Sequence, residues 1–311
     1  MKRAVIFILC CMMAVWLLGC TGEDAVETFD EGGESGMRRT VLYLATEDGY
    51  VVPIMKRIPW EEGIGKAALS YLVSGEDNDR SASAMGLKTV IPEGTGYTLR
   101  IGDDKEATLD LMGCPPHETL AEEQAMVVAI VNTLSEFDGI DRVKITLDGA
   151  SKDALPMGTD ISEAMEKFEL NTEEGELPAS GRANKLTLYF PNISASLNIP
   201  VTRYIDRAPS FAVALQELIA GTDDGRLLNC FPQGTELNSA YIYEGIATVD
   251  LSRAFDDAGY LEGGLEAARD AIYLCANEFE EVYGVDIYVE GQEYSLHTAA
   301  AAAPVYVNEF R

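Results

Sequence analysis

The amino-acid sequence predicts an α+β fold built from two tandem two-layer modules, each with the element order ββαββαβ. Two long segments of the 311-residue chain resemble each other, and strand-like and helix-like hydrophobic periods alternate in the same order within both. Each segment is also long enough to form its own hydrophobic core. We therefore expect a first module at 40–150 and a second at 185–297.

The internal repeat rests on short anchors that recur in the same order at a nearly constant offset. Tyr43 corresponds to Tyr189 and Pro53 to Pro200. The longer matches are IPEGT (91–95) with FPQGT (231–235), ATLDL (107–111) with ATVDL (247–251), and VKITLDG (143–149) with VDIYVEG (285–291). Several ordered matches of this kind indicate that one module has been duplicated.

The first half of each module is predicted to be a strand pair followed by a helix and a second strand pair. Alternating apolar residues favour strands, and apolar residues at i, i+3, i+4 and i+7 favour helices. In the first module the ranges are 41–45, 50–57, 60–74, 97–101 and 106–111, and in the second they are 186–190, 197–204, 209–220, 236–242 and 245–251.

The second half of each module is predicted to be a longer helix and a final strand. In the first module Thr119 and Glu122 form a capping-box pattern that marks the start of this helix. The residues expected to be buried are Met126, Ile130, Leu134 and Phe137 in the first module, and Leu265, Ala268, Ile272, Cys275 and Phe279 in the second.

The N-terminal segment has the pattern of a lipoprotein signal peptide. Lys2 and Arg3 precede an uncharged apolar run, which ends in Leu-Leu-Gly-Cys at Cys20. We expect residues 1–19 to be removed, Cys20 to be acylated, and the protein to be held on the outer face of the cytoplasmic membrane, since two acyl chains anchor stably. An uncleaved anchor and cleavage at another residue are the alternatives. Residues 20–39 are acidic and glycine-bearing, and they predict a flexible tether.

The other connecting segments are predicted from composition. Residues 151–184 read as a linker, in which Ile161, Met165 and Phe168 suggest a short helix packed on the first module. Residues 298–311 include an alanine run and read as a C-terminal tail.

Charge and cysteine content narrow the function. A formal net charge of −29 repels polyanions, which excludes nucleic-acid binding. Besides Cys20, the predicted mature chain contains Cys114, Cys230 and Cys275, without a metal-binding CxxC spacing. Cys275 lies in an apolar helical stripe and is expected to be buried, whereas a Cys114–Cys230 disulfide is left open.

The repeated motifs resemble the GerMN domain, and a lipobox followed by two such domains resembles the GerM family of sporulation and spore-germination lipoproteins. The resemblance covers about 40–149 and 185–291. It implies a non-enzymatic envelope protein, similar in its modules to ring-building motifs, with sporulation-channel proteins as partners. Residues 111–116 depart from the pattern, because LMGCPP stands where the second module has LSRAF.

The candidate chemical residues favour structural or interaction roles over catalysis. His117 and His297 lack a second ligand at helical spacing, and a Cys114/His117 pair lacks an orienting third group. The repeat-equivalent Asp110 and Asp250 are expected to cap loops at strand ends. The repeat-equivalent Glu136 and Glu278 lie near helix C-termini, where a carboxylate is unfavourable, and this suggests a contact between modules. These patterns predict no enzyme, cofactor or metal site.

Two functions remain open at this point. The first is an assembly module that binds protein partners in the envelope. The second is a solute- or glycan-binding lipoprotein with its ligand between the modules, for which Tyr241, Tyr243, Tyr288 and Tyr294 are candidate sugar platforms.

Overall fold

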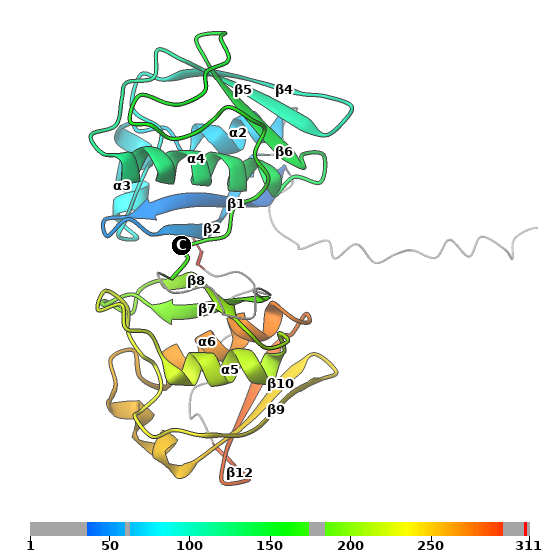
Figure 1. Ribbon diagram of the computed structural model, residues 1–311. Coiled ribbons are helices and arrows are strands. Elements are labelled where there is room, and N and C mark those ends of the chain that lie inside the picture. The colour runs from blue at the N-terminus through cyan, green and yellow to red at the C-terminus, as the bar shows by residue number, and fades with distance from the viewer. Residues whose placement is uncertain (1–35, 60–62, 174–183, 295–307, 310–311) are drawn as a thin grey trace, which may run out of the picture. The chain divides into compact units, whose positions relative to one another are not determined.

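The computed structural model describes residues 36–59, 63–173, 184–294 and 308–309 (Figure 1). The first module contains β1 (Met37–Thr46), β2 (Val51–Pro59), α2 (Ile64–Ser70), α3 (Glu76–Ser83), β3 (Leu87–Lys88), β4 (Gly96–Ile101), β5 (Glu106–Met112), α4 (Leu120–Ser135) and β6 (Arg142–Leu147). The second contains β7 (Asn184–Pro191), β8 (Asn198–Ile205), α5 (Phe211–Ala220), β9 (Leu237–Tyr243), β10 (Ile246–Leu251), the 3-10 helix η1 (Arg253–Tyr260), α6 (Gly264–Asn277), β11 (Gly284–Val289) and β12 (Gln292–Glu293).

Each module has two separate sheets. In the first module the strand orders are β2-β1-β3 and β4-β5-β6, and in the second they are β7-β8 and β12-β11-β10-β9. Within the second sheet of each module, the last long strand runs parallel to its neighbour, β5 with β6 and β10 with β11. The equivalent pairings confirm the duplication at the level of strand register.

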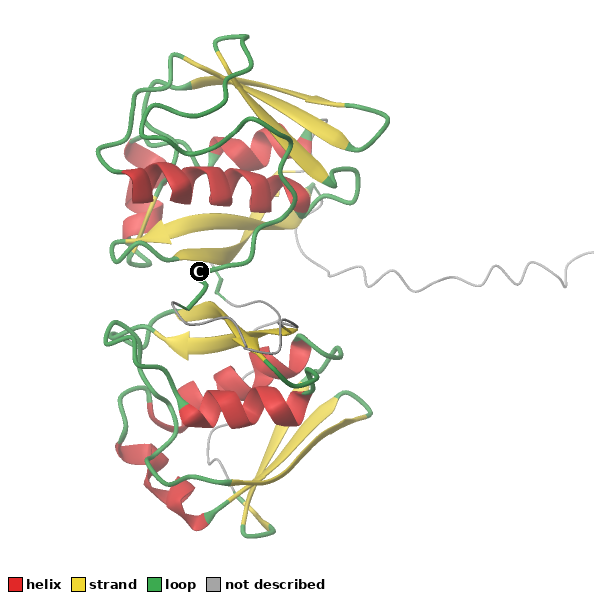
Figure 2. Cartoon of the chain, viewed as in Figure 1, coloured by secondary structure: helices red, strands yellow, loops and turns green. Residues whose placement is uncertain are grey.

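The helices of each module lie between its two sheets (Figure 2). In the second module, for example, α5 contacts both β7 and β9, and α6 contacts both β7 and β11. The α+β class and the two modules are as predicted, but each module has three layers where the sequence suggested two. The reason is visible in α6, which buries residues on nearly all sides, from Ala267 and Ala268 to Cys275 and Ala276.

The helix α4 confirms its predicted start and its predicted buried face. The Thr119 hydroxyl accepts a hydrogen bond from the backbone N–H of Glu122 at 3.2 Å, as a capping box requires. Met126, Ile130, Leu134 and Phe137 are all buried. In the second module Ala268, Ile272 and Cys275 are buried, and Leu265 at the start of α6 is only half-buried. Phe279 is 38 % exposed because α6 ends at Asn277 and the chain turns away before reaching it.

The segment after the first module contains no helix in its described part, 151–173. It is irregular, yet it packs back on the module as expected: Ile161 is buried, and Met165 pairs with Val143 by two backbone hydrogen bonds of 2.8 Å. Backbone pairing with the edge of β6 replaces the predicted helical turn, since it satisfies the polar groups of that edge.

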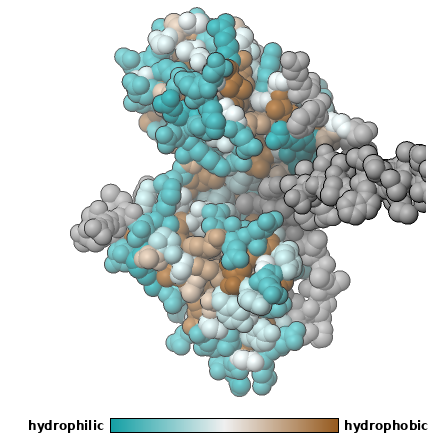
Figure 3. All heavy atoms as spheres, turned by 90° about the vertical axis from the view of Figure 1, so that its right-hand side faces the viewer, coloured by the Kyte–Doolittle hydropathy of each residue, from teal (hydrophilic) through white to brown (hydrophobic). Residues whose placement is uncertain are grey.

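The net charge of −29 places many acidic side chains on the surface. On the side seen in Figure 3, hydrophilic residues predominate and hydrophobic ones form small separate groups. None of the helices within the described ranges is long and apolar enough to cross a membrane.

Candidate functional site

The repeat-equivalent Asp110 and Asp250 fasten turns at the ends of neighbouring strands. Asp110 Oδ1 accepts hydrogen bonds from the Thr146 hydroxyl at 2.7 Å and the Gly149 N–H at 2.8 Å. Asp250 Oδ1 accepts one from the Gly291 N–H at 3.0 Å. The loop that each residue caps therefore follows the adjacent parallel strand, β6 or β11, rather than its own strand. These contacts give both residues a structural role.

The repeat-equivalent Glu136 and Glu278 each accept a hydrogen bond from a buried tyrosine of their own module. The Tyr43 hydroxyl lies 2.7 Å from Glu136, and the Tyr189 hydroxyl donates to Glu278. Burial and the nearby carboxylate raise the pKa of Tyr43 well above its usual value, and the same is true of Tyr189. These bonds join the first strand of a module to the end of its last helix.

The two modules meet at a junction that is held by polar contacts between described residues. It is formed by β2 and β8 together with two segments that we call straps, the first at 168–173 and the second at 308–309. The first strap follows the first module but pairs with β8, through Thr202 N to Leu170 O at 3.0 Å. The second strap follows the second module but pairs with β2, through Met55 N to Asn308 O at 2.7 Å. The straps thus cross from one module to the other.

One asparagine from each strap bridges both modules, and the two do so in the same way. Asn171 binds the N–H and C=O of Val51 at 2.9 and 2.8 Å, and its amide also donates to Pro200 O at 2.7 Å. Asn308 binds the N–H and C=O of Asn198 at 3.0 and 3.1 Å, and donates to Pro53 O at 3.3 Å.

These asparagine contacts obey the internal repeat. Pro53 corresponds to Pro200, and at the same offset Val51 corresponds to Asn198. Each asparagine therefore binds the Val51/Asn198 position of one module and the Pro53/Pro200 position of the other. Sequence reasoning assigned both residues to a linker and a tail. The only local signal is an aliphatic-Asn pair in each strap, Leu170-Asn171 and Val307-Asn308.

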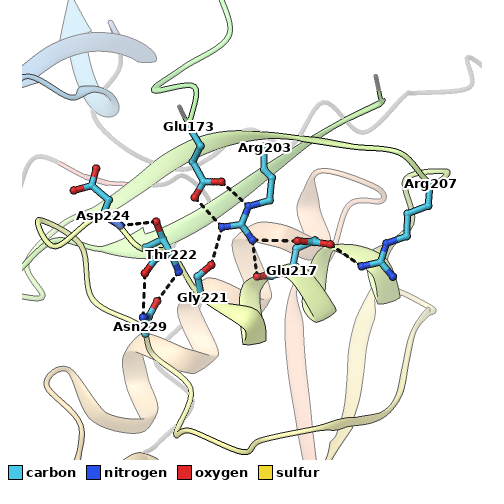
Figure 4. A network of polar contacts seen from close by, with 8 residues as sticks. All are labelled: Glu173, Arg203, Arg207, Glu217, Gly221, Thr222, Asp224 and Asn229. Atoms are coloured by element: carbon cyan, nitrogen blue, oxygen red, sulfur yellow. Dashed lines mark hydrogen bonds and ion pairs between the residues drawn. The ribbon is translucent and has the colours of Figure 1, made fainter. Parts of the chain in front are cut away.

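An ion-pair network fixes the end of the first strap to the second module (Figure 4). Arg203 of β8 binds Glu173 through two hydrogen bonds of 2.5 and 2.7 Å, a bidentate geometry that favours a fixed orientation. The same guanidinium donates to Glu217 and to the carbonyl of Gly221 at the end of α5. Glu173 is thereby tied to both β8 and α5.

A third contact joins the β1–β2 turn to the second module. The Tyr50 hydroxyl donates to Asp224 at 2.5 Å, and the Arg226 guanidinium lies 4.6 Å from the centre of the Tyr50 ring. Arg226 also donates to the carbonyl of Asp48 at 3.0 Å. Its hydrogen bonds to Asp224 hold the pKa of that carboxyl well below the usual range.

The contacts at the junction bear on the solute-binding alternative, which places a ligand between the modules. That alternative requires a cavity lined by both modules, with its tyrosines facing the ligand. Where β2 and β8 meet, the Asn171 and Asn308 side chains bridge the two backbones directly. Tyr241 and Tyr243 lie exposed on β9, and Tyr288 is half-buried on β11. Tyr294 packs edge-on against Phe255, with ring centres 5.7 Å apart.

A small pocket in the first module brings together Cys114, His117 and Met126. The His117 Nε2 atom lies 3.4 Å from the Met126 sulfur. Burial raises the pKa of the Cys114 thiol and lowers that of His117, which disfavours a thiolate–imidazolium pair. Glu123, which also lines the pocket, is occupied by the backbone N–H groups of Met157 and Thr159. The arrangement does not activate a nucleophile.

The remaining candidate residues are free cysteines or lie outside the described ranges. Cys114, Cys230 and Cys275 are all free thiols, so the Cys114–Cys230 disulfide is not formed. Cys230 and Cys275 are buried, as expected for Cys275. Over the described part of the chain, no group of three histidine, cysteine or acidic side chains is placed to bind a metal ion. Cys20, His297 and the predicted signal peptide lie outside the described residues.

The fold and the junction together define a class: duplicated α+β modules, each with helices between two sheets, joined by crossed straps. The chain belongs to the family described as Germane, sporulation and spore germination, which matches residues 41–153 and 187–295.

A sequence comparison and a structure comparison agree with this assignment. The chain is 27 % identical over 273 residues to the spore germination protein GerM of Bacillus subtilis (strain 168), covering 85 % of this chain and 74 % of that protein. The solved structure of the tandem GerMN domains of the sporulation protein GerM from Bacillus subtilis matches with a TM-score of 0.66 at 26 % identity. It covers 88 % of this chain and 100 % of that one. These similarities support a role in sporulation or germination and indicate no enzymatic family.

Proposed function

We propose that this chain is a non-enzymatic, lipid-anchored protein of the outer face of the cytoplasmic membrane, which acts in sporulation or spore germination by binding protein partners in the envelope. The family match and the similarity to GerM support the biological setting. The lipobox at Cys20 supports the anchor.

The crossed straps are the observation that carries the assembly role. Asn171 and Asn308 each bridge the two modules, so the junction holds two similar modules in a fixed relation. A fixed relation between modules suits a protein that presents two surfaces to partners at a defined spacing, because preorganisation lowers the entropy lost on binding. The chemistry of the Cys114/His117 pocket offers no competing catalytic role.

Deletion and complementation test this function. In the spore-forming host, we expect deletion of the gene to lower the yield of heat-resistant spores or to slow their germination, and the wild-type gene to restore it. Crosslinking in sporulating cells should then capture envelope proteins with the full-length chain. A deletion strain that sporulates and germinates like its parent, with no captured envelope protein, would contradict the proposal.

A further inference from the structure

The outer sheet of each module has one face that points away from the helices. In β10, Ala247, Val249 and Leu251 are buried toward the helix layer, whereas Thr248 and Asp250 alternate with them and face outward. The equivalent strand β5 shows the same alternation. Strand register then places outward residues of neighbouring strands side by side, which allows the two faces to be compared position by position.

The central row of the outer face is cationic in the first module. Thr108 on β5 lies between Arg100 of β4 and Lys144 of β6. Arg100 is exposed on the edge strand β4. Lys144 is half-buried, and its ammonium group donates to the carbonyl of Ile161 at 2.9 Å and to that of Ser162, which leaves a third N–H for another acceptor.

The same row is aromatic and anionic in the second module. Thr248 on β10 lies between Tyr241 of β9 and Asp286 of β11. Tyr241 is 54 % exposed and Asp286 is exposed. The threonine is retained, but tyrosine stands in place of arginine, and aspartate in place of lysine. The adjacent row differs little in charge, with Thr98, Asp110 and Thr146 matched by Ser239, Asp250 and Tyr288.

From this inversion we infer that two copies of the chain bind head to tail, with the central row of the first module in one copy facing the central row of the second module in the other. The Arg100 guanidinium can stack on the Tyr241 ring, as arginine prefers, while the Lys144 ammonium group faces Asp286. The threonines at the centre of both rows leave room for the longer flanking side chains.

A second copy fits this surface because every copy carries both halves of the contact. One chain cannot bring its own two rows together, since each outer sheet lies on the opposite side of the helix layer from the hairpin that meets the other module. The contact joins different surfaces, so it propagates into chains or closed rings. This inference rests on the proposed assembly role and names its partner.

The net charge of −29 opposes association but does not forbid it. Repulsion between distant surface charges is screened beyond about 8 Å at physiological salt, whereas the facing rows would be in contact. Exposed ion pairs are individually weak, so the contact should form when the copies are concentrated on a membrane.

Charge-reversed variants of the full lipidated chain, reconstituted in phosphatidylcholine vesicles, test the contact. A carbodiimide reagent couples lysine to a carboxylate in contact, and mixing ¹⁴N- with ¹⁵N-labelled protein identifies links between copies. We expect an intermolecular link between Lys144 and Asp286 in the wild type. Arg100→Asp alone should lower the yield of crosslinked dimer by about tenfold. Asp286→Arg removes the reacting carboxylate, so for this variant association is measured by energy transfer between dye-labelled copies, and it should fall by a similar factor.

Mixing the two variants in equal amounts should restore the dimer. The Arg100→Asp chain keeps an unchanged anionic row and the Asp286→Arg chain keeps an unchanged cationic row, so these two rows can meet. Lys152→Asp, an exposed change outside the rows, is the control and should leave the yield unchanged. Circular dichroism should show both row variants folded.

Three results would overturn the inference. They are no link between copies at dense coverage, an Arg100→Asp variant that crosslinks like the wild type, or an Asp286→Arg variant that still binds other copies but no longer binds a cationic envelope protein. If the deletion strain is defective while the Arg100→Asp chain complements it fully, the head-to-tail contact is refuted and the proposed function is not.

Discussion

Single buried carboxylates stabilise this chain through the backbone groups they hold, and Glu123 is the clearest case. Its two oxygens accept hydrogen bonds from Met157 N–H at 2.8 Å and Thr159 N–H at 2.9 Å, and its side chain is almost fully buried. Burial alone would raise the pKa of Glu123, but these hydrogen bonds outweigh it and lower the pKa. The charged form therefore fastens the 157–159 turn to α4.

Glu123→Gln should lower the free energy of unfolding by about 1–3 kcal/mol at pH 7, since the amide replaces a charged acceptor with a donor. Because the folded-state pKa lies below the ordinary value of 4.5, the stabilisation is present above that pH and is lost as the pH falls through the folded-state pKa. Urea unfolding at pH 7 and pH 4 measures both effects. Glu118→Gln, an exposed change, is the control; equal losses in both variants would contradict the assignment.

The paired tyrosines predict the opposite pH dependence. The pKa values of Tyr43 and Tyr189 are raised by burial and by Glu136 and Glu278, so their contribution is complete below about pH 10 and is lost as the pH rises further. Removing the Tyr43 hydroxyl leaves Glu136 with one partner fewer. We expect Tyr43→Phe to cost about 1–2 kcal/mol at pH 7.

The Tyr43→Phe/Tyr189→Phe double variant should lose less stability than the wild type between pH 9 and pH 11. Unfolding followed by circular dichroism at both pH values makes the comparison. Tyr260→Phe is the control because Tyr260 is 88 % exposed. Equal sensitivity to alkali in the double variant and the wild type would show that other groups control the alkaline transition.

At the scale of elements, the sequence predicted features that depend on residues close together in the chain, such as strand ranges and helix caps. The strand at 97–101 is β4 at Gly96–Ile101, and the Thr119 cap starts α4 where expected. The repeat supplied a second, independent copy of each pattern. The predicted burial of Phe279 was wrong, because helical periodicity was extended past the end of α6 at Asn277.

Contacts between distant segments could not be predicted in this way. Asn171 binds Val51, 120 residues away, and Asn308 binds Asn198, 110 residues away. An asparagine in an extended segment carries no periodic signal, because its role depends on which backbone groups the fold brings to it. For the same reason the outer-face rows became visible only when strand register was known, although Arg100 and Tyr241 lie in predicted strands.

The straps give the prediction that belongs to this scale. Asn171→Ala and Asn308→Ala should each cost about 1–3 kcal/mol, because each removes hydrogen bonds to backbone groups in both modules. The pseudosymmetry of the contacts predicts similar losses for the two variants. Urea unfolding measures them, with the exposed Asn238→Ala as the control. A neutral Asn308→Ala beside a costly Asn171→Ala would mean that the second strap does not hold the junction.

At the scale of the whole molecule, the junction and the anchor have separate tasks. The straps keep two modules in one relation, while the outer faces, with opposite charge in their central rows, remain available. Contacts of this exposed kind are weak in solution. A lipid on Cys20 would confine the chain to a surface and raise its effective concentration, so that weak contacts become sufficient.

Cys20→Ala separates these tasks. The substitution removes the thiol that carries the lipid, so we expect the protein to leave the membrane fraction. The variant gene should then fail to complement the deletion strain. The modules should still unfold at the same urea concentration as in the wild type. Both modules lie within residues 38–311, which form one compact unit. Fusing the Cys20→Ala chain to an unrelated membrane anchor should restore both membrane attachment and complementation. If the released chain complemented as well as the wild type, confinement to the membrane would be unnecessary for its function.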